Sequence, residues 1–222
     1  MNWIFIFNKI INLVYENSCY ICNEASKELV VCKNCENSFI QRNGKNCKSF
    51  KDVEVFSWGF YSGRLRDGMI KLKAGKKKLA NYFSKNLVDL WGNIPSEIKN
   101  KEYLVIPVPS HKKRIKERGY CQSSLIAKDF ARSLNYNFSN QFVIRTKETK
   151  YMNSLNTLND RIINIKNAFK TSEQIPKEKN ILMIDDILTS GNTICELART
   201  IHKKYPDLNL LGLTVASGDT YN

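Results

Sequence analysis

The stretch from Ile181 to Thr193 holds the residues best suited to do chemistry. Four apolar residues are followed by two carboxylates and then by a short turn rich in hydroxyl groups. The residues in question are Asp185, Asp186, Thr189, Ser190, Gly191, Asn192 and Thr193. The backbone amides and hydroxyls of such a turn can cradle one phosphate at the start of a helix, while the carboxylates suit sugar hydroxyls or a magnesium-linked group. The turn is predicted to recognise a phosphorylated ribose; the alternative is that the acidic pair caps a turn that binds nothing.

Four cysteines form a second set with the spacing of metal ligands. Cys19 and Cys22 make one C-x-x-C turn, and Cys32 and Cys35 make another, with nine residues between the turns. Two such turns can aim four thiolates at one point, the tetrahedral arrangement that zinc prefers. Disulfides are the alternative, but nothing in the sequence indicates export. We expect a structural zinc site, closed to substrates because sulfur fills all four positions.

Apolar patterning places these residues on alternating strands and helices. Strands are predicted at 53–61, 103–108, 181–184 and 208–215, and helices at 65–91 (interrupted near Gly75), 122–134 and 193–205. This alternation predicts an α/β fold with a mainly parallel sheet, which binds ligands at the carboxyl ends of its strands. Residues 17–50 contain almost no continuous apolar run, so this segment cannot form its own core and needs a cross-link such as a bound metal to fold. We therefore expect a zinc module with a short N-terminal helix over 1–52 and a larger domain over 53–222.

The stretch 181–193 resembles the 5-phosphoribosyl-1-pyrophosphate (PRPP) motif of type I phosphoribosyltransferases. That motif consists of four hydrophobic residues, two acids, an apolar pair and a T-[TS]-G-x-T loop, and every class is matched here. The resemblance implies a type I phosphoribosyltransferase fold, with PRPP as ligand and magnesium bound with it.

Further motifs narrow the resemblance to one family. Residues 104–110 precede an R-G-Y-C-Q segment at 118–122, and an R…T…L…R..N…AF order follows. The residues of that order are Arg145, Thr149, Leu155, Arg161, Asn164, Ala168 and Phe169. With the cysteine turns, the sequence resembles the ComF family of competence-associated, phosphoribosyltransferase-like proteins over about 19–215.

The family resemblance assigns roles to particular residues. It implies that Val108, Pro109 and Ser110 form a pyrophosphate-binding loop, that Lys73 and Arg118 contact pyrophosphate, and that residues 145–160 close over PRPP. It also implies a part in DNA uptake and a helicase-like competence partner.

Three positions depart from the family pattern. Cys121 replaces an asparagine, Met152 stands near the usual glutamine, and Asn192 replaces a small residue in the phosphate turn. The last two lie where ligand is expected, which leaves turnover open. No nucleophile is required, because phosphoribosyl transfer through an oxocarbenium-like transition state needs positioning, charge neutralisation and exclusion of water.

The chain carries 35 Lys+Arg against 21 Asp+Glu, a formal charge of +14 over 222 residues. Such an excess favours polyanionic partners. Seven basic residues lie within 64–78 and five within 112–118, with aromatic residues in or beside both runs. Basic grooves with aromatic platforms suit single-stranded DNA. The alternative is a solvated basic face in a lysine-rich chain from an AT-rich genome.

Two main functions remain in contention, beside a third in which the chain is a purely structural zinc adaptor whose PRPP fold is inactive. The first is a PRPP-binding protein of DNA uptake that binds single-stranded DNA, with or without turnover. The second is a cytoplasmic phosphoribosyltransferase of nucleotide metabolism with no DNA role. The apolar share of 42% excludes a disordered chain. The absence of a long apolar run and of a signal-peptide pattern leads us to expect a cytoplasmic protein without stable membrane insertion.

Overall fold

A computed structural model of the chain describes residues 18–28, 30–42, 47–51, 53–149, 157–174 and 176–218. The predicted N-terminal helix, Met152 and Leu155 lie outside the described residues. The elements in chain order are α2 (Lys33–Asn37), β1 (Cys47–Phe50), β2 (Val53–Phe60), α3 (Gly63–Lys73), α4 (Lys78–Gly92), α5 (Ser96–Lys99), β3 (Tyr103–Pro107), α6 (Lys112–Arg118), α7 (Gln122–Leu134), β4 (Asn137–Phe138), β5 (Val143–Arg145), α8 (Leu158–Ile165), β6 (Phe169–Thr171), β7 (Asn180–Leu188), α9 (Asn192–Lys204) and β8 (Asn209–Ser217).

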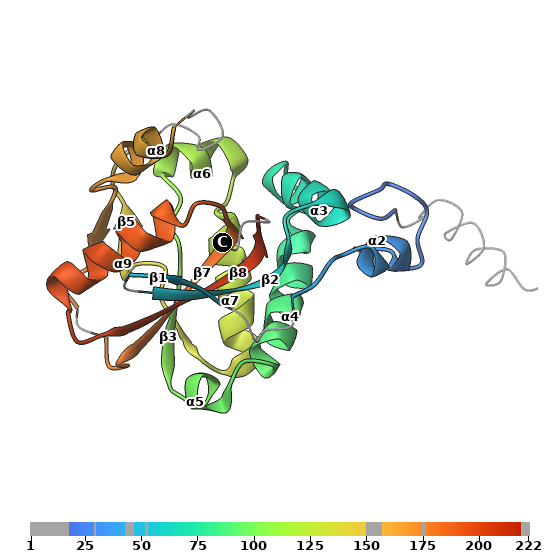
Figure 1. Ribbon diagram of the computed structural model, residues 1–222. Helices are drawn as coiled ribbons and strands as arrows, with labels where there is room; N and C mark the ends of the chain where they lie inside the picture. The colour runs from blue at the N-terminus through green and yellow to red at the C-terminus, as the bar shows by residue number, and fades with distance from the viewer. Residues whose placement is uncertain are drawn as a thin grey trace, which may run out of the picture.

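The main sheet has six strands in the order β1-β2-β8-β7-β3-β4. β1 runs antiparallel to β2, and every other neighbouring pair is parallel. β5 and β6 form a separate antiparallel pair. The mainly parallel α/β sheet predicted from the sequence is therefore confirmed, and β7 and β8 lie at its centre (Figure 1).

β7 contains four successive apolar residues, 181–184, because both faces of the sheet are covered. Leu182 and Ile184 belong to the core on one face, which includes residues of α4 and α7. Ile181 and Met183 belong to the core on the other face, with the apolar side of α9. Successive strand residues point to opposite faces, so a strand covered on both sides needs a continuous apolar run.

The four-cysteine segment packs against α3 and α4. Ile21, between the first two cysteines, is buried, and its Cδ1 lies 3.0 Å from the place where a Cβ on Gly68 of α3 would stand. The Tyr82 hydroxyl of α4 donates to Glu36 of α2 at 3.1 Å. The segment thus shares its core with α3 and α4, beside which it lies in Figure 1. The boundary expected at residue 52 falls between β1 and β2, which pair with each other.

Most predicted elements are present, with one difference that bears on function. The strand predicted at 181–184 continues to Leu188, because β8 pairs alongside it as far as Ser217. Asp185 and Asp186 therefore lie within β7, and the turn begins at Thr189. The sequence patterns did not predict α6 or the β5–β6 pair. In the part of the chain that the structure describes, no helix has the length and apolar character needed to span a bilayer.

Candidate ligand cavity and cysteine cluster

A cavity of about 530 Å³ lies where β3 and β7 end. It brings together nine of the predicted site residues from four parts of the chain: Lys73, Val108, Pro109, Ser110, Arg118, Asp185, Asp186, Thr189 and Thr193. Gly191 lines a smaller adjoining hollow together with Thr189 and Thr193. Ser190 and Asn192 belong to the same turn but line neither space.

The turn between β7 and α9 is shaped for a small anion. Gly191 has φ +77°, a left-handed conformation that few side chains adopt, and it caps the N-terminus of α9. A Cβ at this position would lie 2.2 Å from the Phe50 ring, so a side chain here would also force that ring to move. The turn places the hydroxyl residues Thr189 and Thr193 at the positive end of a 13-residue helix. Amides and hydroxyls at a helix N-terminus are the usual setting for a bound phosphate.

The two carboxylates beside this turn differ in environment. Asp185 accepts a hydrogen bond from the backbone amide of Asp186 at 2.9 Å. Burial, followed by the neighbouring charge of Asp186, raises the pKa of Asp185 well above its ordinary value. Asp186 instead forms an ion pair with Lys73, with 3.0 Å between Nζ and Oδ2. Burial alone would lower the pKa of Lys73, but the carboxylate of Asp186 outweighs it, and the net shift is upward. Lys73 therefore lines the cavity with Asp186 as its partner, and its contact with pyrophosphate stays a prediction.

Three further arginines line the cavity, and of these the sequence pointed only to Arg145, as a motif residue at the start of the segment expected to close over PRPP. Arg66 comes from α3, Arg114 from α6 and Arg145 from the end of β5. With Lys73 and Arg118 they place five cations around two carboxylates, which favours a polyanionic ligand. The available signals were the basic run at 112–118 and the motif arginine at 145. Because the sequence patterns did not predict α6 or the β5–β6 pair, neither signal indicated which of these side chains face the cavity.

Arg145 is the most enclosed of these cations. It is 8% exposed, and it lines the cavity. Burial, followed by the like charge of Arg114, lowers the pKa of Arg145 to about 10. Its side chain is nevertheless charged at neutral pH, so a cation lies buried in the cavity.

The four cysteines converge near α2. Their sulfur atoms all lie within 4.8 Å of one another, with 3.8 Å between Cys19 and Cys35 and 3.7 Å between Cys22 and Cys32. A zinc–sulfur bond of about 2.3 Å implies sulfur–sulfur edges of roughly 3.8 Å in a tetrahedron. None of the four forms a disulfide. The cluster therefore fits a four-thiolate zinc site.

Comparisons with known proteins agree with this geometry. The family description "Phosphoribosyl transferase domain" matches residues 122–216, which run from α7 to β8. The chain is 32% identical over 102 residues to Competence protein F of Haemophilus influenzae, covering 45% of this chain and 44% of that protein. It is 23% identical over 194 residues to Competence protein ComFC of Bacillus subtilis, covering 84% and 72%. These findings support the ComF family for this chain. Its fold is accordingly the phosphoribosyltransferase α/β fold, with a four-cysteine cluster near the N-terminus.

Two other similarities are more limited. DNA utilization protein YhgH of Shigella flexneri is 31% identical over 99 residues, covering 44% of this chain and 42% of that protein. The matches thus span less than half the length of the Haemophilus and Shigella relatives. Adenine phosphoribosyltransferase from Leishmania donovani superposes with a TM-score of 0.27 at 13% identity, over 86% of this chain and 84% of that one.

Proposed function

We propose that this chain binds PRPP with magnesium in the 530 Å³ cavity. The observation that carries the proposal is the turn at 189–193, whose Thr189 and Thr193 line the same cavity as the acidic pair of β7 and the turn at 108–110. The three groups match the three chemistries of PRPP: a phosphate, a ribose with free hydroxyls, and a pyrophosphate.

Each part of the cavity then has a separate task. The turn before α9 holds the 5-phosphate, and the carboxylates of Asp185 and Asp186 accept hydrogen bonds from the ribose hydroxyls. The turn at 108–110, with the nearby cation Arg118, holds the pyrophosphate. Lys73 must release Asp186 or share it, because the two are paired in the absence of ligand. Magnesium would supply charge neutralisation of the pyrophosphate.

Calorimetry tests this proposal. Magnesium and PRPP are titrated into the wild type and into an Asp185→Asn/Asp186→Asn variant, with Asp89→Asn/Asp207→Asn as a charge-matched control away from the cavity. We expect binding by the wild type and the control, and a loss of at least about tenfold in the cavity variant. Absence of binding by the wild type would refute the proposal.

We also propose that the chain acts in DNA uptake and binds single-stranded DNA. Two relatives are named as competence proteins and a third as a DNA utilization protein. Support from the structure comes from α3 and α6, which both line the cavity and carry the two basic runs. Beyond the cavity, Lys76 and Lys77 are exposed and lie 4.8 Å and 4.9 Å from the ring centroids of Tyr20 and Tyr120.

Oligonucleotide binding at two salt concentrations tests the DNA proposal. The Lys76→Gln/Lys77→Gln/Lys78→Gln variant removes three exposed charges after α3. Its control, Lys85→Gln/Lys101→Gln/Lys128→Gln, removes three exposed charges elsewhere. We expect the first variant alone to weaken binding and to reduce the salt dependence. Wild-type protein that binds no oligonucleotide at about 50 mM salt would favour the second function, a phosphoribosyltransferase of nucleotide metabolism.

We propose zinc as the metal of the four-cysteine cluster, with a structural role. Four thiolates leave no coordination position open, and the cluster packs against α3 and α4. Metal analysis of purified protein should find about one zinc per chain, and Cys35→Ser should lower both the zinc content and the thermal stability. Full zinc content in that variant would contradict the assignment.

A further inference from the structure

Arg145 is a buried cation that makes no direct ion pair among the described residues, although the charge of Asp185 acts on it and favours its charged form. It is 8% exposed, it lines the cavity, and its Nε has no hydrogen-bond partner in the described part of the chain. Its terminal amino group donates to a neutral oxygen, the Thr149 hydroxyl. A buried charge without a direct ionic partner is costly, so Arg145 gains from an anionic ligand in the cavity.

A second guanidinium, that of Arg114, also donates a hydrogen bond to Thr149. Arg114 of α6 donates to the Thr149 carbonyl oxygen at 2.8 Å and also lines the cavity. Thr149 is itself 8% exposed, so two arginines meet at one buried threonine through its two oxygens. An anionic oxygen binds a guanidinium more strongly than a hydroxyl or carbonyl does, and a phosphate can serve two guanidiniums at once.

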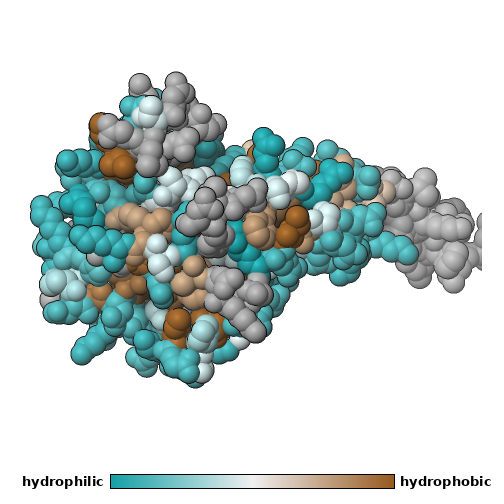
Figure 2. Space-filling view, in the orientation of Figure 1, coloured by the Kyte–Doolittle hydropathy of each residue, from teal (hydrophilic) through white to brown (hydrophobic). Residues whose placement is uncertain are grey.

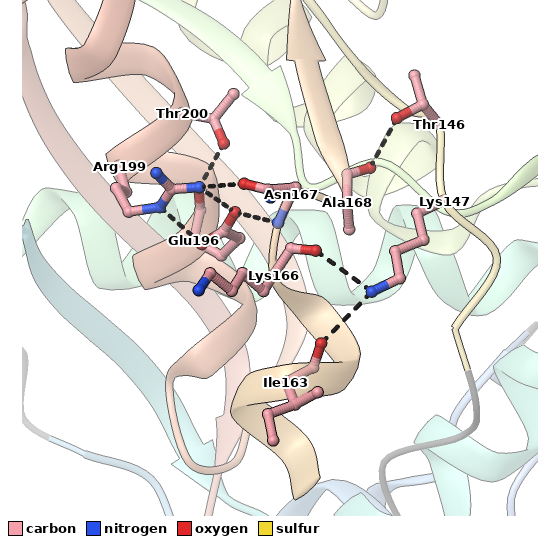
Figure 3. A network of polar contacts seen from close by, with 9 residues as sticks. All are labelled: Thr146, Lys147, Ile163, Lys166, Asn167, Ala168, Glu196, Arg199 and Thr200. Carbon is pink, nitrogen blue, oxygen red and sulfur yellow. Dashed lines mark hydrogen bonds and ion pairs between the residues drawn. The ribbon is translucent and has the colours of Figure 1, made fainter. Parts of the chain in front are cut away.

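The segment that precedes Thr149 is held in place by hydrogen bonds from Thr146 and Lys147. Figure 3 shows the Lys147 ammonium reaching the carbonyls of Ile163 and Lys166, and the Thr146 hydroxyl reaching that of Ala168. The turn after α8 is in turn held to α9, because Glu196 accepts from the Asn167 amide at 2.7 Å. Arg145 itself pairs with Phe169 of β6, so the strand end that carries it is linked through this turn to α9, the helix that follows the phosphate turn. Ile162 and Ile163 of α8 are exposed and do not line the cavity, and Figure 2 shows hydrophobic surface in the region of α8.

We propose that Arg145 and Arg114 form an anion subsite that Thr149 fills in the ligand-free protein and that a pyrophosphate group takes over on binding. This inference rests on the proposed function and adds two things to it. It assigns two residues to the site, and it makes Thr149 an internal competitor of the ligand. Removing the Thr149 hydroxyl should therefore strengthen binding of the anion.

Calorimetry with the two halves of PRPP tests the subsite. Magnesium pyrophosphate and ribose 5-phosphate are titrated separately into wild type, Arg145→Gln, Arg145→Lys and Thr149→Val. Arg132→Gln is the charge-matched control, since Arg132 is 71% exposed and does not line the cavity. We expect Arg145→Gln to weaken pyrophosphate at least about tenfold and to leave ribose 5-phosphate within about twofold. Arg145→Lys should retain part of the affinity, and Thr149→Val should bind pyrophosphate more tightly than wild type.

Each outcome separates the subsite from the proposed function. Wild type and Arg145→Gln that bind pyrophosphate and PRPP equally would overturn the subsite and leave PRPP binding intact. Equal weakening of both half-ligands by Arg145→Gln would assign the arginine a structural role. If Arg145→Gln does not fold, as judged by its thermal melt, Arg145→Lys and Thr149→Val decide: unchanged pyrophosphate affinity in both overturns the subsite. Wild type that binds none of the ligands overturns both proposals.

Discussion

One part of the cavity comes from a single stretch of chain, and another part is assembled from three. The acidic wall consists of Asp185 and Asp186 together with Thr189 and Thr193 of the turn that follows them, all at or just after the end of β7. The basic wall consists of Arg66 and Lys73 from α3, Arg114 and Arg118 from α6, and Arg145 from β5. Only the acidic wall is continuous in sequence. Its geometry depends mainly on local backbone conformation, whereas that of the basic wall depends on how three elements pack.

The two walls meet at one ion pair. Lys73 of the basic wall binds Asp186 of the acidic wall at 3.0 Å. Because the acidic wall depends on local backbone conformation, we expect a substitution in its turn to change both stability and ligand binding. A substitution in the basic wall should change ligand binding mainly by removing a positive charge. The following variants test this difference, from the largest expected effect to the smallest.

Gly191→Ala should have the largest effect, because it strains the turn in two ways. The left-handed conformation and the 2.2 Å approach to Phe50 together should lower the free energy of unfolding by about 2–5 kcal/mol. PRPP binding should be lost as well. Urea denaturation checks the stability. Adding Phe50→Ala should restore the part of the lost unfolding free energy that is due to the contact with the ring, whereas the part due to backbone strain should remain. Complete recovery of stability would show that the left-handed conformation at residue 191 does not destabilise the variant.

A double-mutant cycle measures the link between the walls. Lys73→Met and Asp186→Asn should each destabilise the ligand-free protein, since each leaves a partly buried charge or polar group without its partner. The coupling energy should be about 1 kcal/mol, because the Lys73 side chain is 34% exposed and its charge is partly screened. Additive effects in the cycle would mean that the ion pair does not connect the two walls in solution.

Asp185 should give the acidic wall a pH dependence. Because its pKa is raised in the folded protein, the folded state holds this proton more tightly than the unfolded state does. The stability that results is complete below the ordinary aspartate pKa of about 4 and is lost as pH rises through the raised value. In the wild type, the free energy of unfolding should therefore decrease as the pH rises above about 4. Asp185→Asn should make this decrease smaller and should stabilise the protein at neutral pH. Denaturation curves over a pH series would show an unaltered profile if the carboxyl is not responsible.

Arg66→Gln should have the smallest effect. The Arg66 side chain is exposed, so its contribution to ligand binding is screened by solvent and salt. We expect PRPP affinity to fall by no more than about threefold, with the difference disappearing at high salt. A tenfold loss that persists in high salt would place Arg66 in direct contact with the ligand.

The contrast between the walls also explains what the sequence could predict. The strands at 53–61, 103–108 and 208–215 and the helix at 122–134 are present in the structure, because periodic burial leaves a direct trace in the sequence. The turn 189–193 could be recognised because a few adjacent residue types define it. Arg114 and Arg145 could not be placed, since nothing local to either residue records that both meet at Thr149. The extent of β7 was underestimated for a similar reason, because it depends on pairing with β8.

The central claim is that both walls bind one ligand in one cavity, and competition tests it most directly. Magnesium and PRPP are titrated into wild-type protein that is saturated with ribose 5-phosphate and, separately, with pyrophosphate. The account predicts that each half-ligand weakens the apparent affinity for PRPP, because each occupies one of the two walls. PRPP binding that is unaffected by either half-ligand at saturation would contradict it.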